Sequence, residues 1–180
     1  MKKKIVYVPL AVDFLHEGHI NILRIAKKYG DVMVGLLTDE AIANYKSIPI
    51  LDYKNRKLLV ENLKYVSKVV PQKTEDYSYN LNKIKPNFFV HGDDWKYDNR
   101  KKTRNKVIKT LKKWSGKLIE PKYTKNISSS KIKSKIFKIA TLPQNRVSRL
   151  KRLMSSKQIV RILESHNSLT GLIVENLKVQ

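Results

Sequence analysis

The chain contains no cysteine, and this absence limits the chemistry open to it. Without thiols there can be no disulfide framework, thiolate metal site or thiol nucleophile, which excludes secreted disulfide scaffolds and zinc fingers. Long apolar runs are also absent, because no stretch approaches the roughly 18 uncharged residues that a membrane span needs. The amino-terminal lysines precede an apolar run, but Asp13 and His16 interrupt it and no small-residue cleavage site follows. We therefore expect a soluble cytoplasmic protein with no membrane partner.

Acidic residues are scarce, since 15 of the 180 residues are acidic and 38 are basic, and the formal net charge is +23. Residues 96–140 carry 16 of the basic residues and 2 of the acidic ones, so most of the excess lies there. Such a surface attracts phosphate backbones, and one interpretation is a non-catalytic nucleic-acid or anion-binding module. The aromatic residues in this stretch are scattered, unlike those of a base-stacking surface, so nucleic acid is the less favoured partner.

Apolar runs alternate with segments of helical spacing along the chain. This alternation predicts an α/β fold built on a doubly wound parallel sheet. In such sheets ligands bind beyond the carboxyl ends of the strands, which are here the loops after Val12, Leu37 and Val90. The predicted strands are 5–12, 32–37, 67–70, 88–91 and 118–120, and the predicted helices are 18–29, 53–65, 81–84, 104–114 and one opened by the serines 128–130.

Two histidines three residues apart, His16 and His19, follow the first predicted strand and begin a helix. A helix N-terminus presents free backbone N–H groups and a positive dipole end to anions, and Gly18 lets the backbone approach a phosphate. Imidazoles donate hydrogen bonds to phosphate oxygens and can carry charge as a transition state forms. The alternatives are a histidine pair without a role, or half of a metal site. A helical zinc site needs i, i+4 spacing and further ligands, which we do not find, so we favour phosphate binding.

Four runs of residues carry a family resemblance. They are VDFLHEGH at 12–19, RKL at 56–58, HGDDW at 91–95 and NISSSKI at 126–132. In order and content they resemble the cytidylyltransferases of the H-x-G-H nucleotidyltransferase superfamily, especially those similar to glycerol-3-phosphate cytidylyltransferase. The resemblance covers about residues 4–137 and implies a Rossmann-like nucleotidyltransferase fold for a cytidylyltransferase domain at 1–140.

The resemblance also implies the roles of individual residues toward CTP. His16, His19 and Lys46 would act on the phosphates while an acceptor oxygen attacks the α-phosphorus in line and pyrophosphate leaves. Lys46, taken alone, is equally well a solvated surface lysine. The implied cofactor is Mg²⁺, with Asp13 and Asp94 as candidate ligands. The residues implied in nucleotide binding are Leu10, Ala11, Asp13, Arg56, Gly92, Asp93, Asp94, Trp95, Thr124, Ile127, Ser128, Ser129 and Ser130.

Three stretches depart from the family pattern. Residues 10–12 are Leu-Ala-Val where Gly-Thr-Phe is common, Tyr123 stands where an arginine is usual, and Asn126 stands where a glycine is usual. Loss of that arginine removes a phosphate contact. Either Lys122 or Lys125 replaces it, or the acceptor pocket has diverged, and the identity of the acceptor is therefore left open.

The tail bears on the choice of acceptor. Residues 149–154 and 164–175 resemble the opening helix and first strand of phosphoenolpyruvate mutase, whose catalytic barrel is absent, so we assign no mutase activity. We expect 141–180 to be a linker and the short helical stub of a neighbouring mutase domain, dispensable for transfer.

Fusions of this kind occur in phosphonate biosynthesis, and residues 45–47, 69–74 and 123–124 resemble the same group. The expected acceptor is then a phosphonate such as 2-hydroxyethylphosphonate. The alternative is glycerol 3-phosphate or another phospho-alcohol. Because relatives of this kind are often dimers, a homodimer is also expected.

Overall fold

The structure is a computed structural model, and it describes residues 3–96, 100–124, 132, 143–156 and 164–176. Its strands are β1 (Ile5–Leu10), β2 (Asp31–Leu37), β3 (Lys68–Gln72), β4 (Phe88–Val90) and β5 (Lys117–Ile119). Its α-helices are α1 (Glu17–Lys27), α2 (Asp39–Ala43), α3 (Tyr53–Glu61), α4 (Ser78–Ile84), α5 (Lys101–Leu111), α7 (Pro143–Ser156) and α8 (Ser168–Asn176). Short 3₁₀ turns are η1 (Asp93–Lys96) and η2 (Lys112–Trp114). None of the described helices is long and apolar enough to cross a membrane.

The five strands form one parallel sheet in the order β3-β2-β1-β4-β5. The direction of winding reverses between β1 and β4, where Tyr7 of β1 is in register with Met33 on one side and Phe89 on the other. This confirms the prediction of a doubly wound parallel sheet. It also creates a crevice beyond the carboxyl ends of β1 and β4, the place where such sheets bind ligands.

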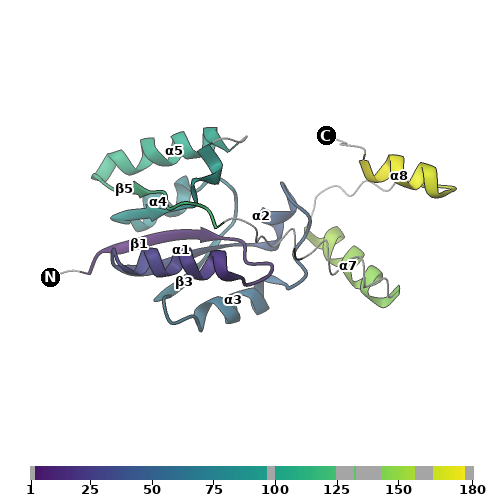
Figure 1. Cartoon of the computed structure of the whole chain (residues 1–180), viewed down its shortest axis with the longest axis horizontal. Helices are drawn as coiled ribbons and strands as arrows, with labels where there is room; N and C mark the ends of the chain where they lie inside the picture. The colour runs from purple at the N-terminus through teal and green to yellow at the C-terminus, as the bar shows by residue number, and fades with distance from the viewer. Residues whose placement is uncertain (1–2, 97–99, 125–131, 133–142, 157–163, 177–180) are drawn as a thin grey trace.

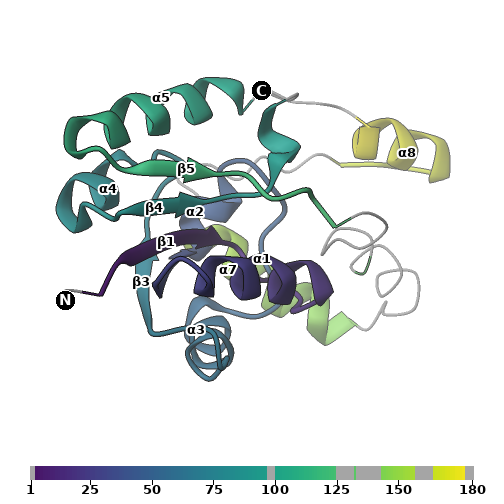
Figure 2. The ribbon, with the colours of Figure 1, turned by 60° about the vertical axis from the view of Figure 1, so that its left-hand side comes forward.

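Helices cover both faces of the sheet (Figures 1 and 2). On one face, α1 and α3 bury Leu23, Ala26 and Val60 against the apolar side chains of β1 and β2. On the other face, α4 and α5 pack Leu81 and Val107 against an aromatic cluster that includes Tyr7, Phe89 and Trp95. Because β1 and β2 are covered on both sides, their residues are apolar almost without interruption, as is usual for central parallel strands.

A buried polar cluster ties β1 to β3 and α4. The Tyr7 hydroxyl donates a hydrogen bond to Gln72 Oε1 (2.6 Å), and Asn80 Nδ2 donates to both Tyr7 Oη and Gln72 Oε1 (2.9 Å each). The tyrosine ring crosses over Gly35 of β2, where an added Cβ would lie 1.9 Å from Tyr7 Oη. Position 35 therefore has to be glycine while Tyr7 occupies this space.

Several element boundaries differ from the sequence prediction for local reasons. β1 ends at Leu10 rather than Val12, because Val12 has a left-handed backbone (φ +49°) that no strand residue can adopt. α3 ends at Glu61 rather than Tyr65, because the Asn62 side chain donates to the Leu58 carbonyl (2.8 Å) and terminates the helix. The predicted helix at 104–114 is split into α5 and a 3₁₀ turn, and the helix opened by the serines 128–130 lies outside the described residues.

The tail contains two helices beyond the carboxyl edge of the sheet (Figure 1). α7 lies against α2, whereas α8 stands away from the α/β body in both ribbon views (Figures 1 and 2). Two helices agree with the expected helical extension, but α8 is a helix where the resemblance to the mutase implied its first strand. The division into a domain at 1–140 and a stub at 141–180 remains a prediction.

Candidate active site

A cavity of about 230 Å³ lies in the crevice beyond β1 and β4. Its walls come from the loop after β1, the start of α1, the segment after α2, and the loops after β3, β4 and β5. Nine of the residues implied by the family resemblance line it together: Leu10, Ala11, Asp13, His16, His19, Lys46, Gly92, Asp94 and Thr124.

The two histidines stand side by side at the start of α1. Their ring centroids are 3.9 Å apart, and His16 is the extended N-cap residue of the helix. The backbone N–H of His16 donates a hydrogen bond to His19 Nδ1 (3.4 Å). In the neutral ring the proton is therefore on His19 Nε2, which makes that atom a hydrogen-bond donor. A Cβ on Gly18 would lie 3.0 Å from His16 Cε1, so glycine makes room for the His16 ring.

The surroundings disfavour the charged form of both imidazoles. Burial, followed by repulsion from a protonated His16 and from Lys46, lowers the pKa of His19 from 6.5 to about 3. Burial and the charge of Lys46 lower the pKa of His16 as well. Among the described residues, His16 Nδ1 is a buried polar atom without a hydrogen-bond partner, as expected where a ligand supplies one. An anion placed against these rings and Lys46 would find hydrogen-bond donors and a cation.

The HGDDW run after β4 divides between the cavity and the core. His91, Gly92 and Asp94 line the cavity. Trp95 is fully buried behind them, stacked on His91 (4.0 Å between centroids), and its indole N–H donates to Glu120 Oε1 (2.7 Å). Asp93 lies outside the cavity wall, and its Oδ1 accepts the N–H of Tyr123 (2.8 Å). Trp95 and Asp93 are therefore placed to hold the walls of the cavity rather than to line it.

Arg56 is also placed behind the cavity. Its side chain is fully buried, and its guanidinium forms an ion pair with Asp39 (2.7 Å) and donates to the carbonyl oxygens of Ala11 (2.5 Å) and Leu51 (3.2 Å). Arg56 thus holds the loop after β1 in position without lining the cavity. Its predicted role in nucleotide binding is, in this arrangement, an indirect one.

The candidate metal ligands do not form a ligand set. Asp13 Oδ1 accepts the N–H of Ile50 (2.6 Å), and Asp94 Oδ2 pairs with Arg100 (2.7 Å). Within the part of the chain that the structure describes, no three His, Cys, Asp or Glu side chains come together as a metal site. These residues do not fit a metal held by the protein alone, so we derive no chemical step through one.

Several cavity residues were not singled out by the sequence. Tyr45, Glu75, Tyr77 and Arg100 form a wall contributed by the segments after α2, β3 and η1. Tyr45 lies in the run 45–47 that resembles the phosphonate group but has no implied role, and only positions after predicted strands or at the start of a basic helix could have pointed to the other three. His91 lies within the HGDDW run, but the family resemblance implies no role for it.

The last implied motif is only partly described. Tyr123 and Thr124 line the cavity, and the Asn21 amide donates to Thr124 Oγ1 (3.4 Å). Lys122 lines it as well, next to the position of the missing arginine. Ile127, Ser128, Ser129 and Ser130 lie outside the described residues, so their predicted contacts remain predictions.

Comparison with known proteins identifies the family to which the chain is similar. Residues 12–135 match the cytidylyltransferase-like family. Glycerol-3-phosphate cytidylyltransferase of Staphylococcus aureus is 35% identical over 144 residues, covering 76% of this chain and 96% of the relative. The Bacillus subtilis enzyme of the same name is 38% identical over 97 residues, covering 53% of this chain and 74% of the relative. The crystal structure of a lipopolysaccharide core biosynthesis protein from Thermoplasma volcanium superposes with a TM-score of 0.58 at 25% identity, covering 68% of this chain and 98% of that one.

Proposed function

The chain belongs to the cytidylyltransferase-like family of nucleotidyltransferases, and on this premise we propose that it transfers CMP from CTP to a small phospho-alcohol such as glycerol 3-phosphate, releasing pyrophosphate. The observation that carries the proposal is the pair of uncharged histidines at the N-terminus of α1, facing a cavity at the reversal point of the sheet. A match that covers 96% of a glycerol-3-phosphate cytidylyltransferase and 76% of this chain favours the phospho-alcohol over the phosphonate as acceptor.

The reaction needs charge stabilisation and alignment rather than covalent catalysis. A phosphate oxygen of the acceptor attacks the α-phosphorus, one P–O bond forms, and the bond from the α-phosphorus to the bridging oxygen of pyrophosphate breaks. Negative charge grows on the transferring and leaving oxygens. The N–H of His19 Nε2 and the ammonium of Lys46 would stabilise it, with the backbone N–H groups at the start of α1.

The phosphates of CTP would also alter the histidines themselves. Their pKa values are low because burial and Lys46 disfavour the charged form. A bound triphosphate brings opposite charge and favours the protonated form. The imidazoles would therefore gain positive charge as negative charge accumulates on the nucleotide.

Mg²⁺ would enter with its substrate. Because Mg²⁺ is commonly bound through one or two carboxylates and the substrate phosphates, the MgCTP complex is the form in which we expect it. The chain would supply the binding site for the triphosphate. The carboxylates of Asp13 and Asp94 in the cavity already have partners in the protein.

A second candidate acceptor is a phosphonate such as 2-hydroxyethylphosphonate. It is favoured by Tyr123-Thr124 at the cavity wall, where the glycerol-phosphate pattern has an arginine, and by the resemblance of the tail to a mutase. Both acceptors are dianions, so Lys46, Arg100 and Lys122 around the cavity would attract either one.

Pyrophosphate release with MgCTP and each acceptor tests both assignments. We expect turnover with glycerol 3-phosphate and a CMP adduct of matching mass, and a clear preference for 2-hydroxyethylphosphonate would favour the second candidate.

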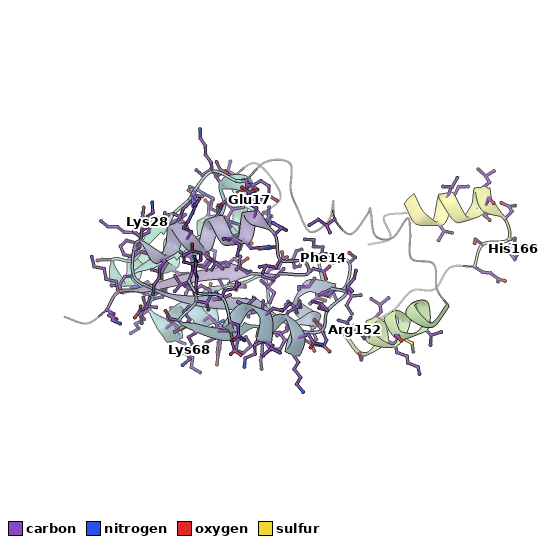
Figure 3. All side chains as sticks on the ribbon, turned by 60° about the horizontal axis from the view of Figure 1, so that its bottom comes forward. Phe14, Glu17, Lys28, Lys68, Arg152 and His166 are labelled. Carbon is purple, nitrogen blue, oxygen red and sulfur yellow. The ribbon has the colours of Figure 1, made fainter. Side chains whose placement is uncertain are left out.

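His16→Ala and His19→Ala should each lower kcat by roughly 10²- to 10⁴-fold. His166→Ala is the matched control, because that histidine is exposed just before α8, away from the α/β body (Figure 3), and does not line the cavity. Full activity in both site variants would contradict the proposal.

A further inference from the structure

The tail helix α7 reaches the α/β body through Arg152 (Figure 3). Its guanidinium forms an ion pair with Asp39 Oδ2 (3.3 Å) and donates a hydrogen bond to the carbonyl oxygen of Ile50. The apolar side chains of the same helix, Val147, Leu150 and Met154, are largely exposed. Leu153 is half-buried, and the polar contacts of α7 are directed through Arg152 at two specific groups.

Both of these groups also hold the loop after β1. Asp39 Oδ1 pairs with the buried Arg56, whose guanidinium donates to the carbonyl of Ala11. The N–H of Ile50 donates to Asp13 Oδ1 (2.6 Å), while its carbonyl accepts from Arg152. Arg152 is thus one step from each of the two contacts that fix Ala11 and Asp13 on the cavity wall.

The loop between those two contacts needs support. Val12 lies between them with a left-handed φ of +49°, which is unfavourable for a β-branched residue. Such a conformation persists only where the surrounding contacts impose it. At this loop the contacts come from Arg56 on one side of Val12 and from Ile50 on the other. Arg152 contacts Asp39, the partner of Arg56, and the Ile50 carbonyl.

We propose that Arg152 is a positioning residue for the active-site loop, and that α7 thereby belongs to the working transferase. The inference goes beyond the proposed function and rests on it for its catalytic part. It also differs from the sequence expectation that 141–180 is dispensable for transfer. Arg152 acts through Asp39 and Ile50 and touches no substrate.

The test compares Arg152→Ala with Lys151→Ala in the full chain. Lys151 is the exposed neighbour on α7, so its substitution removes the same charge. We expect Arg152→Ala to lower kcat/KM for CTP about 3- to 30-fold, the range for residues coupled to a site without touching it. Arg152→Lys should recover part of the loss, because an ammonium can reach one of the two groups but lacks the fork that bridges both. Lys151→Ala should match the wild type.

Hydrogen–deuterium exchange provides a readout that does not need turnover. In Arg152→Ala, peptides covering 10–16 and 49–51 should exchange faster, while peptides of α4 and α5 stay unchanged. A uniform rise across the chain, unchanged exchange in both loop peptides, or faster loop exchange with unaltered kcat/KM would each overturn the proposal. If the wild-type chain shows no CTP turnover, the proposed function fails instead, and the exchange data alone decide whether Arg152 holds the loop.

Discussion

The charge state of His19 follows from where the chain buries it. An exposed histidine is about half charged near pH 6.5, but this ring lies against His16 with Lys46 nearby, and its pKa is lowered to about 3. Its Nδ1 accepts a backbone N–H, so the neutral ring is held in the tautomer that donates from Nε2. In the folded chain His19 is therefore a neutral hydrogen-bond donor through Nε2.

This low pKa predicts an acid sensitivity of folding. Between pH 6.5 and about 3 the unfolded chain binds a proton at His19 that the folded chain does not, so stability falls as the pH is lowered through this window. The slope from one such group is at most about 1.4 kcal/mol per pH unit. Urea unfolding at pH 7 and pH 5 should therefore show a smaller acid loss for His19→Asn than for the wild type.

His166→Asn serves as the control for this measurement, because its side chain is exposed. It should leave the acid loss unchanged. An equal loss of stability in the wild type and in His19→Asn would show that His19 keeps an ordinary pKa in the folded chain.

The sequence predicted some site residues better than others. His16, His19 and Gly92 could be predicted because their motifs directly follow strands, and the carboxyl ends of parallel strands meet at one edge. The burial of Arg56 and Trp95 could not be read from the same motifs, because it depends on tertiary packing against Asp39, Ala11 and Glu120. Arg100 belongs to no motif and follows no predicted strand, so the sequence did not point to it.

At the scale of elements, one carboxylate joins three parts of the fold. Glu120, just after β5, accepts two hydrogen bonds from Arg104 of α5 (2.8 and 2.9 Å) and one from Trp95 of η1, and it pairs with Lys96 (3.3 Å). Hydrogen bonds from Arg104, Trp95 and Lys96 lower the pKa of Glu120 from 4.5 to about 2. This contact holds α5 and the loop after β4 against the edge of the sheet.

We therefore predict that Glu120→Gln destabilises the fold by about 2 kcal/mol, the range for hydrogen bonds to a charged group. Glu61→Gln is the matched control, because it removes the same charge from an exposed i, i+4 pair with Lys57 and should cost less than about 0.5 kcal/mol. The stability advantage of the wild type over Glu120→Gln should disappear as the pH falls from 4.5 toward 2, because only the ionised form of Glu120 is stabilising. Denaturant midpoints that match between the two variants would argue against this role.

Element order was easier to predict than element ends. The alternation of apolar runs and helical spacing is enough for a parallel α/β sheet, because right-handed crossovers leave few topologies. The ends depend on single residues. Thr38 and Asp52 cap α2 and α3 through their side chains, whereas the left-handed Val12 is imposed by the neighbouring loops and has no local sequence signature.

For the whole molecule, the dominant property is its charge. Exposed lysines at 101, 102 and 109 give α5 a basic outer face, on the layer of the sheet away from α1 and its histidines (Figure 2). A chain with a net charge of +23 will attract polyanions whatever its activity. Polyanion binding alone would not identify the protein as a nucleic-acid-binding module.

We predict that any binding of single-stranded RNA is non-specific and weakens at least about tenfold between 50 and 200 mM salt, because it depends on counterion release. Filter binding or fluorescence anisotropy across this range would measure it, with pyrophosphate release followed in the same buffers. Tight RNA binding that survives 200 mM salt, in a chain that does not turn over CTP, would support the nucleic-acid alternative instead.

The packing of Tyr7 over Gly35 has a consequence for how this sequence can change. Each side chain at position 35 would enter the volume that the tyrosine ring fills, so a single substitution there is blocked whatever its polarity. A smaller residue at position 7 would open that volume but leave Gln72 and Asn80 without their hydroxyl partner. Positions 7, 35, 72 and 80, on three strands and a helix, are therefore expected to change together. A combinatorial library that varies all four at once can reach sequences that a series of single substitutions cannot.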